Sequence, residues 1–553
     1  MNHSIRIGNL FDNNSFVGYV KGVSSEEIKI HFPSAKILRR FKNYFLSYPG
    51  AAIGKFVLIE GETRGFIARI LEVYIPESER KSLSEHAVEN SDSIFHPFGR
   101  AELLLSFDLT EPTLTEKSVE HFPSIGDKVY SCSFQFQQNF ISCACSNSAN
   151  DGPIIQLGRT VDSNVALSVH ANSLFGRHCA ILGTTGGGKS WSLAHLVGSF
   201  LKQTQNKIIL LDATGEYSAL PTAPVSIGKN AHINYAKLTN SEFCYLLAEQ
   251  SPNTTATLCN AIDSLKLARI LNDNSVLIKA GKSVSSVQEK INEYHTRFYQ
   301  QDFELVSLPS QIRNECVKEN QRGIYETYDF RLNFCSGLIA RVENLIRNGA
   351  FVDLFGIGKD DSIDIFQHID CFFKNPTSKL LRIDFSKLSY EYNARELAVD
   401  LISRYLLKHA RSDSFRTNPI LFCVDEAHQF LNKGGLFDNN AAFSMTGVNQ
   451  IAKEGRKYGL FLCIATQMPR DIPVDVMSQM GTFIIHRLIN DADRAAVYKS
   501  CSSTNSSSLS YLPMLGAGEA LLCGIDFPMP LLIKVSKPQF EPNSHTPSFV
   551  SSR

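Results

Sequence analysis

The sequence predicts an α/β fold in which a small N-terminal β-barrel precedes an α/β core, and a helical insertion interrupts that core. Before about residue 150, short alternating segments are separated by Gly and Pro, which is typical of a barrel. Beyond that point, continuous apolar runs alternate with amphipathic helical patterns, as in a parallel sheet buried on both faces. The expected parts are the barrel at 1–150, the core at 151–238 and 375–537, the insertion at 239–374 and a C-terminal tail at 538–553.

Length and composition are those of a folded, soluble protein with several domains. The chain has 553 residues, of which 43% are hydrophobic and 20% charged. Lys plus Arg number 55, as do Asp plus Glu, so no net basic field indicates a nucleic-acid partner. Any contact with DNA must therefore come from a local cluster of basic side chains.

The sequence also predicts the cellular location of the protein and the redox state of its cysteines. No basic and apolar leader opens the chain, and no apolar run is long enough for a bilayer, so we expect a cytoplasmic protein without membrane contact. The thirteen cysteines are scattered, and Cys179, Cys423 and Cys463 lie inside apolar runs, which predicts reduced core residues. Cys143 and Cys145 have the spacing of neither a zinc site nor a redox motif.

The barrel and the core are predicted from different hydrophobic periods. Ile28 to Phe32 alternates strictly and Gly65 to Tyr74 has strand composition, whereas Ala394 to His409 repeats its apolar residues at helical spacing. Within 239–374 the spacing of Leu258, Ile262 and Leu265 is helical as well. The expected core strands are Cys179–Leu182, Ile208–Leu211, Ile420–Val424, Leu460–Ala465 and Phe483–Ile485.

A glycine-rich loop follows the first core strand and precedes a helical pattern that begins at Trp191. Its sequence fits G-x-x-x-x-G-K-[ST], whose backbone N–H groups and helix N-terminus bind nucleotide phosphates. Lys189 would reach the β- and γ-phosphates, and the Ser190 hydroxyl would bind Mg²⁺; a chance match in a glycine-rich turn is the alternative. The predicted ATP-binding residues are Gly183, Thr184, Thr185, Gly186, Gly187, Gly188, Lys189, Ser190 and Trp191. A P-loop core of the RecA-like type is therefore expected.

Two further core strands end in polar residues suited to ATP hydrolysis. Asp425 would hold Mg²⁺ and Glu426 would activate the attacking water, although an acidic strand end facing solvent is the simpler explanation for this pair alone. Gln467 follows the next strand and could sense the γ-phosphate. Arg456, in a basic cluster, is a candidate arginine finger for an adjacent subunit, unless the cluster is only a solvated helix face.

In combination, these motifs resemble the HerA-type ATPases of the HerA–FtsK superfamily, which are hexameric DNA translocases. The matching segments cover nearly all of the α/β core and include Ile181–Ser190, Asp212–Tyr217, Val424–His428, Glu454–Gly459, Ala465–Gln467, Ser478–Leu488 and Gly516–Ala520. The resemblance implies a homo-hexamer around double-stranded DNA, with Arg456 acting in trans, Gln467 as sensor and Arg177 as a further phosphate contact. It also implies that the barrel, of the HAS-barrel type, assembles the ring and docks an effector.

That effector would be a NurA-type nuclease, a sirtuin-like NADase or another nuclease, in DNA end processing or antiphage defence. A different hypothesis is a hexameric scaffold that activates its effector with little translocation. A DEAH-box helicase would need a second RecA-like domain, for which the 128 residues after Asp425 are too few, and a conjugation coupling ATPase would carry membrane spans. Lys433 and Arg470, which follow core strands, are candidates for DNA contacts in the pore.

Overall fold

In the computed structural model the chain forms two compact units, Met1–Asn206 with Phe461–Arg553 and Lys207–Leu460. The structure describes residues 10–544 apart from 77–95, 142–151, 432–445 and shorter gaps at 26, 40, 44–45, 49, 111–114, 117–120, 135, 139, 162, 248, 250, 272–275, 299–300, 360, 391–393, 502–505 and 528.

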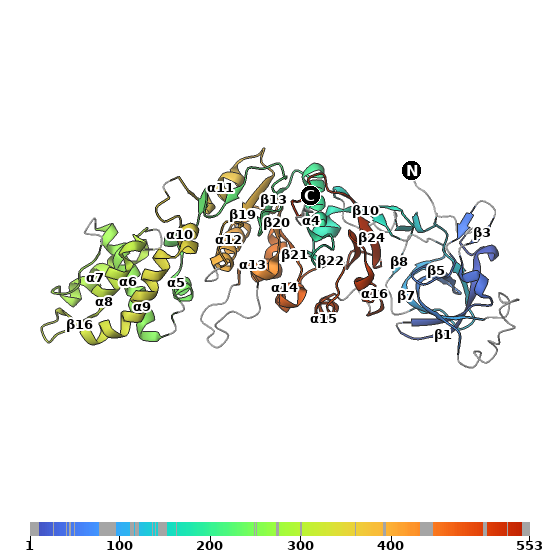
Figure 1. Cartoon of the computed structure of the whole chain (residues 1–553), viewed down its shortest axis with the longest axis horizontal. Coiled ribbons are helices and arrows are strands. Elements are labelled where there is room, and N and C mark those ends of the chain that lie inside the picture. Colours follow the sequence, from blue (N-terminus) through green and yellow to red (C-terminus); the bar gives the residue numbers. More distant parts are fainter. Residues whose placement is uncertain are drawn as a thin grey trace, which may run out of the picture. The chain divides into compact units, whose positions relative to one another are not determined.

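The first unit begins with the predicted barrel (Figure 1). Six antiparallel strands close it in the order β1-β9-β5-β6-β7-β2, because β2 pairs with both β1 and β7. Ile28 and Ile30 of β2 point inward and are fully buried, as their alternation predicts. The strands are β1 Phe16–Val23, β2 Glu27–His31, β5 Phe56–Glu60, β6 Arg64–Tyr74, β7 Phe98–Asp108 and β9 Lys128–Ser131; β8 Thr115–Glu116 adds to β7, and β3 Phe41–Asn43 pairs with β4 Leu46–Tyr48.

The same unit contains part of the core sheet, in the order β11-β10-β24-β23-β22-β12-β21. β22, β12 and β21 pair in parallel, as predicted, while the strands from β23 outward, which the sequence did not predict, are antiparallel. The strands are β10 Ile154–Thr160, β11 Ala166–His170, β12 Cys179–Leu182, β21 Leu460–Thr466, β22 Thr482–Ile485, β23 Glu519–Gly524 and β24 Leu531–Val535. The helices are α3 Ala171–Phe175, α4 Lys189–Gln203, α14 Val474–Met477, α15 Asp491–Ser500 and α16 Ser506–Leu509.

The second unit holds four parallel strands in the order β20-β13-β19-β14. Every residue of β20 and β19 is buried, which explains why these strands appear in the sequence as unbroken apolar runs. The elements are β13 Lys207–Asp212, β14 Val225–Ser226, β19 Leu380–Asp384, β20 Ile420–Val424, α12 Ala394–Arg411, α13 Gly447–Glu454 and the 3-10 helix η10 Gly455–Tyr458.

Between β14 and β19 the chain is mainly helical, in agreement with the predicted insertion. Thr239 caps α5 by accepting from the Glu242 N–H, while the Glu242 side chain accepts from the Thr239 N–H. Two short strand pairs, β15–β18 and β16–β17, interrupt the helices. The helices are α5 Asn240–Leu246, α6 Pro252–Ile270, α7 Val284–Tyr294, α8 Leu308–Glu315, α9 Asp329–Arg347, α10 Gly349–Phe355 and α11 Ile365–Lys374, and the strands are β15 Ala231–His232, β16 Val317–Glu319, β17 Tyr325–Thr327 and β18 Ile363–Asp364.

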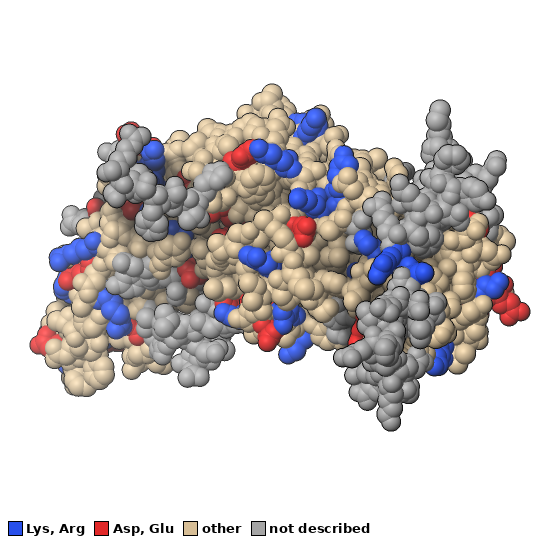
Figure 2. Space-filling model, turned by 45° about the vertical axis from the view of Figure 1, so that its right-hand side comes forward, with Lys and Arg blue, Asp and Glu red and all other residues tan. Residues whose placement is uncertain are grey.

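The three cysteines of the apolar runs agree with the sequence prediction. Cys179, Cys423 and Cys463 are buried free thiols, whereas Cys143 and Cys145 lie outside the described residues. In the part of the chain that the structure describes, no helix is both long and apolar enough to cross a membrane. On the face shown in Figure 2, basic and acidic side chains are scattered among one another.

Candidate nucleotide-binding site

The glycine-rich loop has the backbone shape that phosphate binding requires. It connects β12 to α4, which begins at Lys189, and Gly186 and Gly188 adopt φ values of 74° and 112°. Such angles are unfavourable for residues with a Cβ atom. Lys189 is only 5% exposed, and the 15-residue α4 places the N–H groups of its first turn, which have no acceptor within the helix, next to the loop.

Neighbouring chain segments fix this loop from two sides. The Thr184 N–H and hydroxyl donate to the Arg487 carbonyl at 2.9 and 3.0 Å, directly after β22. On the other side the Gly518 N–H donates to the Gly187 carbonyl at 3.1 Å. A Cβ atom on Gly188 would lie 2.9 Å from the Gly518 Cα, so the contact with the 516–519 turn excludes any side chain there.

His486 connects three elements beneath the loop. Its Nδ1 lies 2.8 Å from the Glu519 carbonyl, which only accepts, so Nδ1 carries the proton. Nε2 must then accept from the Ser192 hydroxyl of α4, at 2.8 Å. The ring is completely buried, and burial, opposed by the bond to Glu519 and reinforced by the charge of Lys189, lowers the pKa of His486 to about 4. A neutral imidazole therefore holds α4 to the start of β23.

Gln467 lies beside the loop in this unit. It directly follows β21, and its Oε1 accepts from the Thr185 hydroxyl at 2.6 Å. The loop and the predicted sensor are thus brought together by the parallel pairing of β12 with β21, in which Leu182 is opposite Thr466. Sensing of the γ-phosphate by Gln467 stays a prediction.

In the second unit, Asp425 and Glu426 follow the carboxyl end of β20. The Asp425 N–H donates to the Leu211 carbonyl at 3.1 Å, and Asp425 is 1% exposed. Glu426 takes up the left-handed conformation with φ 46°, which is uncommon for a residue with a side chain and is frequent at functional sites. Its Oε2 lies 3.3 Å from His428 Nδ1.

Asp212, at the end of β13, organises a turn whose role the sequence chemistry did not reveal. Its carboxylate accepts from the Arg382 guanidinium at 2.7 Å and from the N–H groups of Gly215 and Tyr217 at 2.8 and 3.1 Å. The charge of this fully buried group is therefore neutralised. Within the described residues Glu216 Oε2, in the same turn, is buried without a hydrogen-bond partner. Of the two acidic residues in this turn, Glu216 rather than Asp212 therefore has a carboxylate oxygen that could contact a ligand.

The structure places the remaining predicted residues as follows. Arg456 lies on η10 in the second unit and is exposed. Arg177 precedes the amino end of β12, away from the P-loop at its carboxyl end, and is 3.2 Å from Asp526, so it is not brought to the P-loop of its own chain. Arg470 lies within 4 Å of both Asp471 and Asp493, and Lys433 is outside the described residues.

Two family models match this chain across both units. The model described as "Helicase HerA, central domain" matches residues 155–409, and "Helicase HerA-like C-terminal" matches 413–539. This chain belongs to the HerA helicase family. Membership implies ATP hydrolysis, as the sequence predicts.

HerA proteins of archaea are among its relatives. The chain is 25% identical over 397 residues, 70% of each chain, to "DNA double-strand break repair helicase HerA" of Pyrococcus furiosus. It is 27% identical over 395 residues, 69% of each chain, to the protein of the same name from Sulfolobus acidocaldarius. Among solved structures, VirB4 of Thermoanaerobacter pseudethanolicus has a TM-score of 0.47 at 14% identity, with 71% of this chain and 99% of VirB4 covered.

Proposed function

We propose that this HerA-family chain is the motor subunit of a homo-hexameric ring that moves along double-stranded DNA by hydrolysing ATP. The observation that carries the proposal is the P-loop held by Arg487, Gly518 and His486, with Gln467 in contact with it. Relatives named as DNA double-strand break repair helicases support DNA as the substrate.

The residues divide the chemistry among themselves. Lys189 binds the β- and γ-phosphates, while the Ser190 hydroxyl and the Asp425 carboxylate supply the hard oxygen ligands that Mg²⁺ prefers. When bound, Mg²⁺ would neutralise charge that develops on the phosphates. Glu426, whose Oε2 lies 3.3 Å from His428 Nδ1, takes the proton of the attacking water. Gln467 reports the presence of the γ-phosphate through its contact with the P-loop.

Arg456 would complete the site of the adjacent subunit. It is exposed, and within the described residues no ion pair engages it, in contrast to Arg411, which pairs with Glu454 at 2.6 Å. An uncommitted guanidinium on a tight 3-10 turn is suited to a transition state in another chain. Hydrolysis would then depend on assembly of the ring.

The barrel ring would dock an effector in the cytoplasm. As the resemblance to HerA-type ATPases implies, this partner would be a nuclease of the NurA type, another nuclease, or a sirtuin-like NADase in antiphage defence. The barrel supports such a role because its fold closes without the core strands and leaves side chains such as Ile53 and Ile125 exposed at 56% and 73%.

The test is steady-state ATP hydrolysis by the purified protein, with and without double-stranded DNA. Glu426→Gln serves as the blank because it removes the base and leaves the P-loop intact. We expect DNA to stimulate the wild-type rate several-fold, and the variant to bind nucleotide but to hydrolyse it at least 100-fold more slowly. Hydrolysis that is unaffected by DNA, together with an effector that Glu426→Gln rings still activate, would favour the scaffold instead.

A further inference from the structure

The helical part of the second unit contains a small polar cavity that ATP hydrolysis does not use. Its volume is about 130 Å³, and it lies among α6, α7, α8, β16, β17 and α9. An engineered cavity of about 150 Å³ holds one benzene molecule, so this slightly smaller one has room for roughly five non-hydrogen atoms. The polar side chains that line it and bear on the argument are Asn260, Asp263, Lys279, Glu315, Tyr325 and Arg331.

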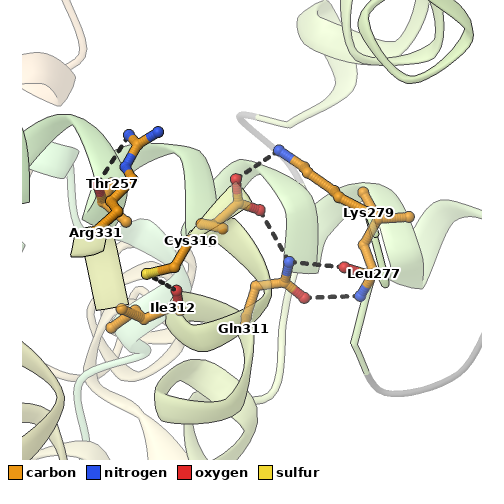
Figure 3. A network of polar contacts seen from close by, with 8 residues as sticks. Thr257, Leu277, Lys279, Gln311, Ile312, Cys316 and Arg331 are labelled. Carbon is orange, nitrogen blue, oxygen red and sulfur yellow. Dashed lines mark hydrogen bonds and ion pairs between the residues drawn. The ribbon is translucent and has the colours of Figure 1, made fainter. Parts of the chain in front are cut away.

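A buried ion pair forms one wall. Lys279 Nζ lies 2.5 Å from Glu315 Oε2, and the two side chains are 6% and 3% exposed. Gln311 donates to Glu315 Oε1 at 2.9 Å and exchanges two hydrogen bonds with the backbone of Leu277, as Figure 3 shows for Gln311 and Leu277. Because this network satisfies both charges, Lys279 and Glu315 are fixed in place and neutral as a pair.

Two side chains of the lining, Asp263 and Arg331, carry opposite charges and form no ion pair among the described residues. Asp263, half-buried on α6, has neither an ion pair nor a hydrogen bond within the described residues, and burial raises its pKa. Arg331 at the start of α9 donates from Nη2 to Thr257 Oγ1 at 3.2 Å, which leaves other guanidinium N–H groups available (Figure 3). Thr257, Asn260 and Asp263 recur every three residues, so they share one face of α6.

The balance of charges selects the class of ligand. A phosphate or other anion on Arg331 would face the carboxylate of Asp263, whereas a divalent cation on Asp263 would face the guanidinium of Arg331. Among the described residues no group of three His, Cys, Asp or Glu side chains is arranged to hold a metal ion. A molecule with one carboxylate and one ammonium group could pair with Arg331 and Asp263 at once.

We propose that this cavity binds a small amino acid, with its carboxylate on Arg331 and its ammonium group on Asp263. Asn260 and Tyr325 supply further hydrogen bonds to the ligand. The Lys279–Glu315 pair forms a rigid polar floor. The site lies outside the nucleotide-binding machinery and does not depend on the proposed motor activity.

The experiment is isothermal titration calorimetry of the full-length protein with single compounds. The panel contains glycine, β-alanine, 4-aminobutyrate and the common L-amino acids, with propionate and propylamine as probes that each carry one of the two charges. We expect at least one amino acid to bind with micromolar to millimolar Kd, and both single-charge probes to bind at least tenfold more weakly. Glycine, β-alanine and 4-aminobutyrate differ in the distance between carboxylate and ammonium group, so the one that binds best indicates how far apart Asp263 and Arg331 lie.

Variants decide whether the cavity is responsible. Asp263→Asn and Arg331→Gln are each expected to weaken binding at least tenfold, whereas Arg322→Gln, an exposed change in the β16–β17 turn, leaves it unchanged. If either cavity variant fails to fold, Gln288→Trp at the exposed rim of the cavity blocks entry without removing a buried charge. The proposal is overturned if no amino acid binds, if a single-charge probe binds equally well, or if binding survives all three changes.

Discussion

Gly188 shows how one residue without a side chain makes the P-loop possible. Its φ of 112° and the 2.9 Å approach of a built Cβ to Gly518 Cα act together. We expect Gly188→Ala to weaken nucleotide binding at least tenfold, because the added methyl group would push the loop away from the 516–519 turn and out of the position that binds the phosphates. Binding of a fluorescent ATP analogue measures the loss.

Gly281→Ala is the matched control for that change. Gly281 also has a positive φ, 82°, but a Cβ there meets no atom within 4 Å. Its cost is limited to backbone strain of about 1–2 kcal/mol, and ATP binding should be unaffected. Equal binding by Gly188→Ala and wild type would show that the close approach of Gly518 does not set the shape of the loop.

At the scale of elements, His486 joins β22, α4 and β23, and this link is sensitive to pH. The pKa of His486 is about 4 in the folded protein and about 6.5 in an unfolded chain. The unfolded state therefore binds the extra proton first as pH falls below 6.5, and stability decreases down to pH 4. By linkage, the loss amounts to about 2 kcal/mol at pH 5.

His486→Asn tests this dependence, since the amide keeps a donor near Nδ1 and does not titrate. We predict a lower stability at pH 7 but a smaller decrease between pH 7 and pH 5 than in wild type, measured from urea unfolding midpoints. His486→Gln should retain the contact with Ser192 instead, and its KM for ATP should lie closer to that of wild type. An identical pH slope in wild type and His486→Asn would refute the assignment.

The elements also show what a sequence can predict. β12 and β20 match their predicted limits because buried strands give apolar runs with clear ends. The antiparallel strands β10 and β24 were not predicted. Each forms a hairpin with its neighbour in the sequence, β11 or β23, but their pairing with each other joins segments that are distant in the sequence. The same holds within the site: Lys189 and Glu426 follow from local motifs, whereas the roles of His486 and Gly518 depend on contacts that only the folded chain creates.

At the scale of the whole molecule, the position of Arg456 predicts that activity requires more than one subunit. Arg456→Ala should abolish hydrolysis and leave nucleotide binding intact, while Lys457→Ala, an equally exposed neighbour on η10, should remain active. Mixed rings of Arg456→Ala and Lys189→Ala chains should recover part of the turnover, because some interfaces join an intact P-loop to an intact arginine. Absence of recovery in rings shown to be mixed would exclude action in trans.

The pairing of β12 with β21 and β22 has a consequence for how the protein is made. Cys179 lies opposite Cys463 and Thr482, and Thr160 lies opposite Ile533. The first unit therefore needs strands that come before Lys207 and strands that come after Leu460. The second unit is continuous from Lys207 to Leu460 and emerges from the ribosome between them. It can fold during synthesis, whereas β12 and the loop that follows it must wait for the last strands, and an incompletely translated chain would therefore lack a finished P-loop.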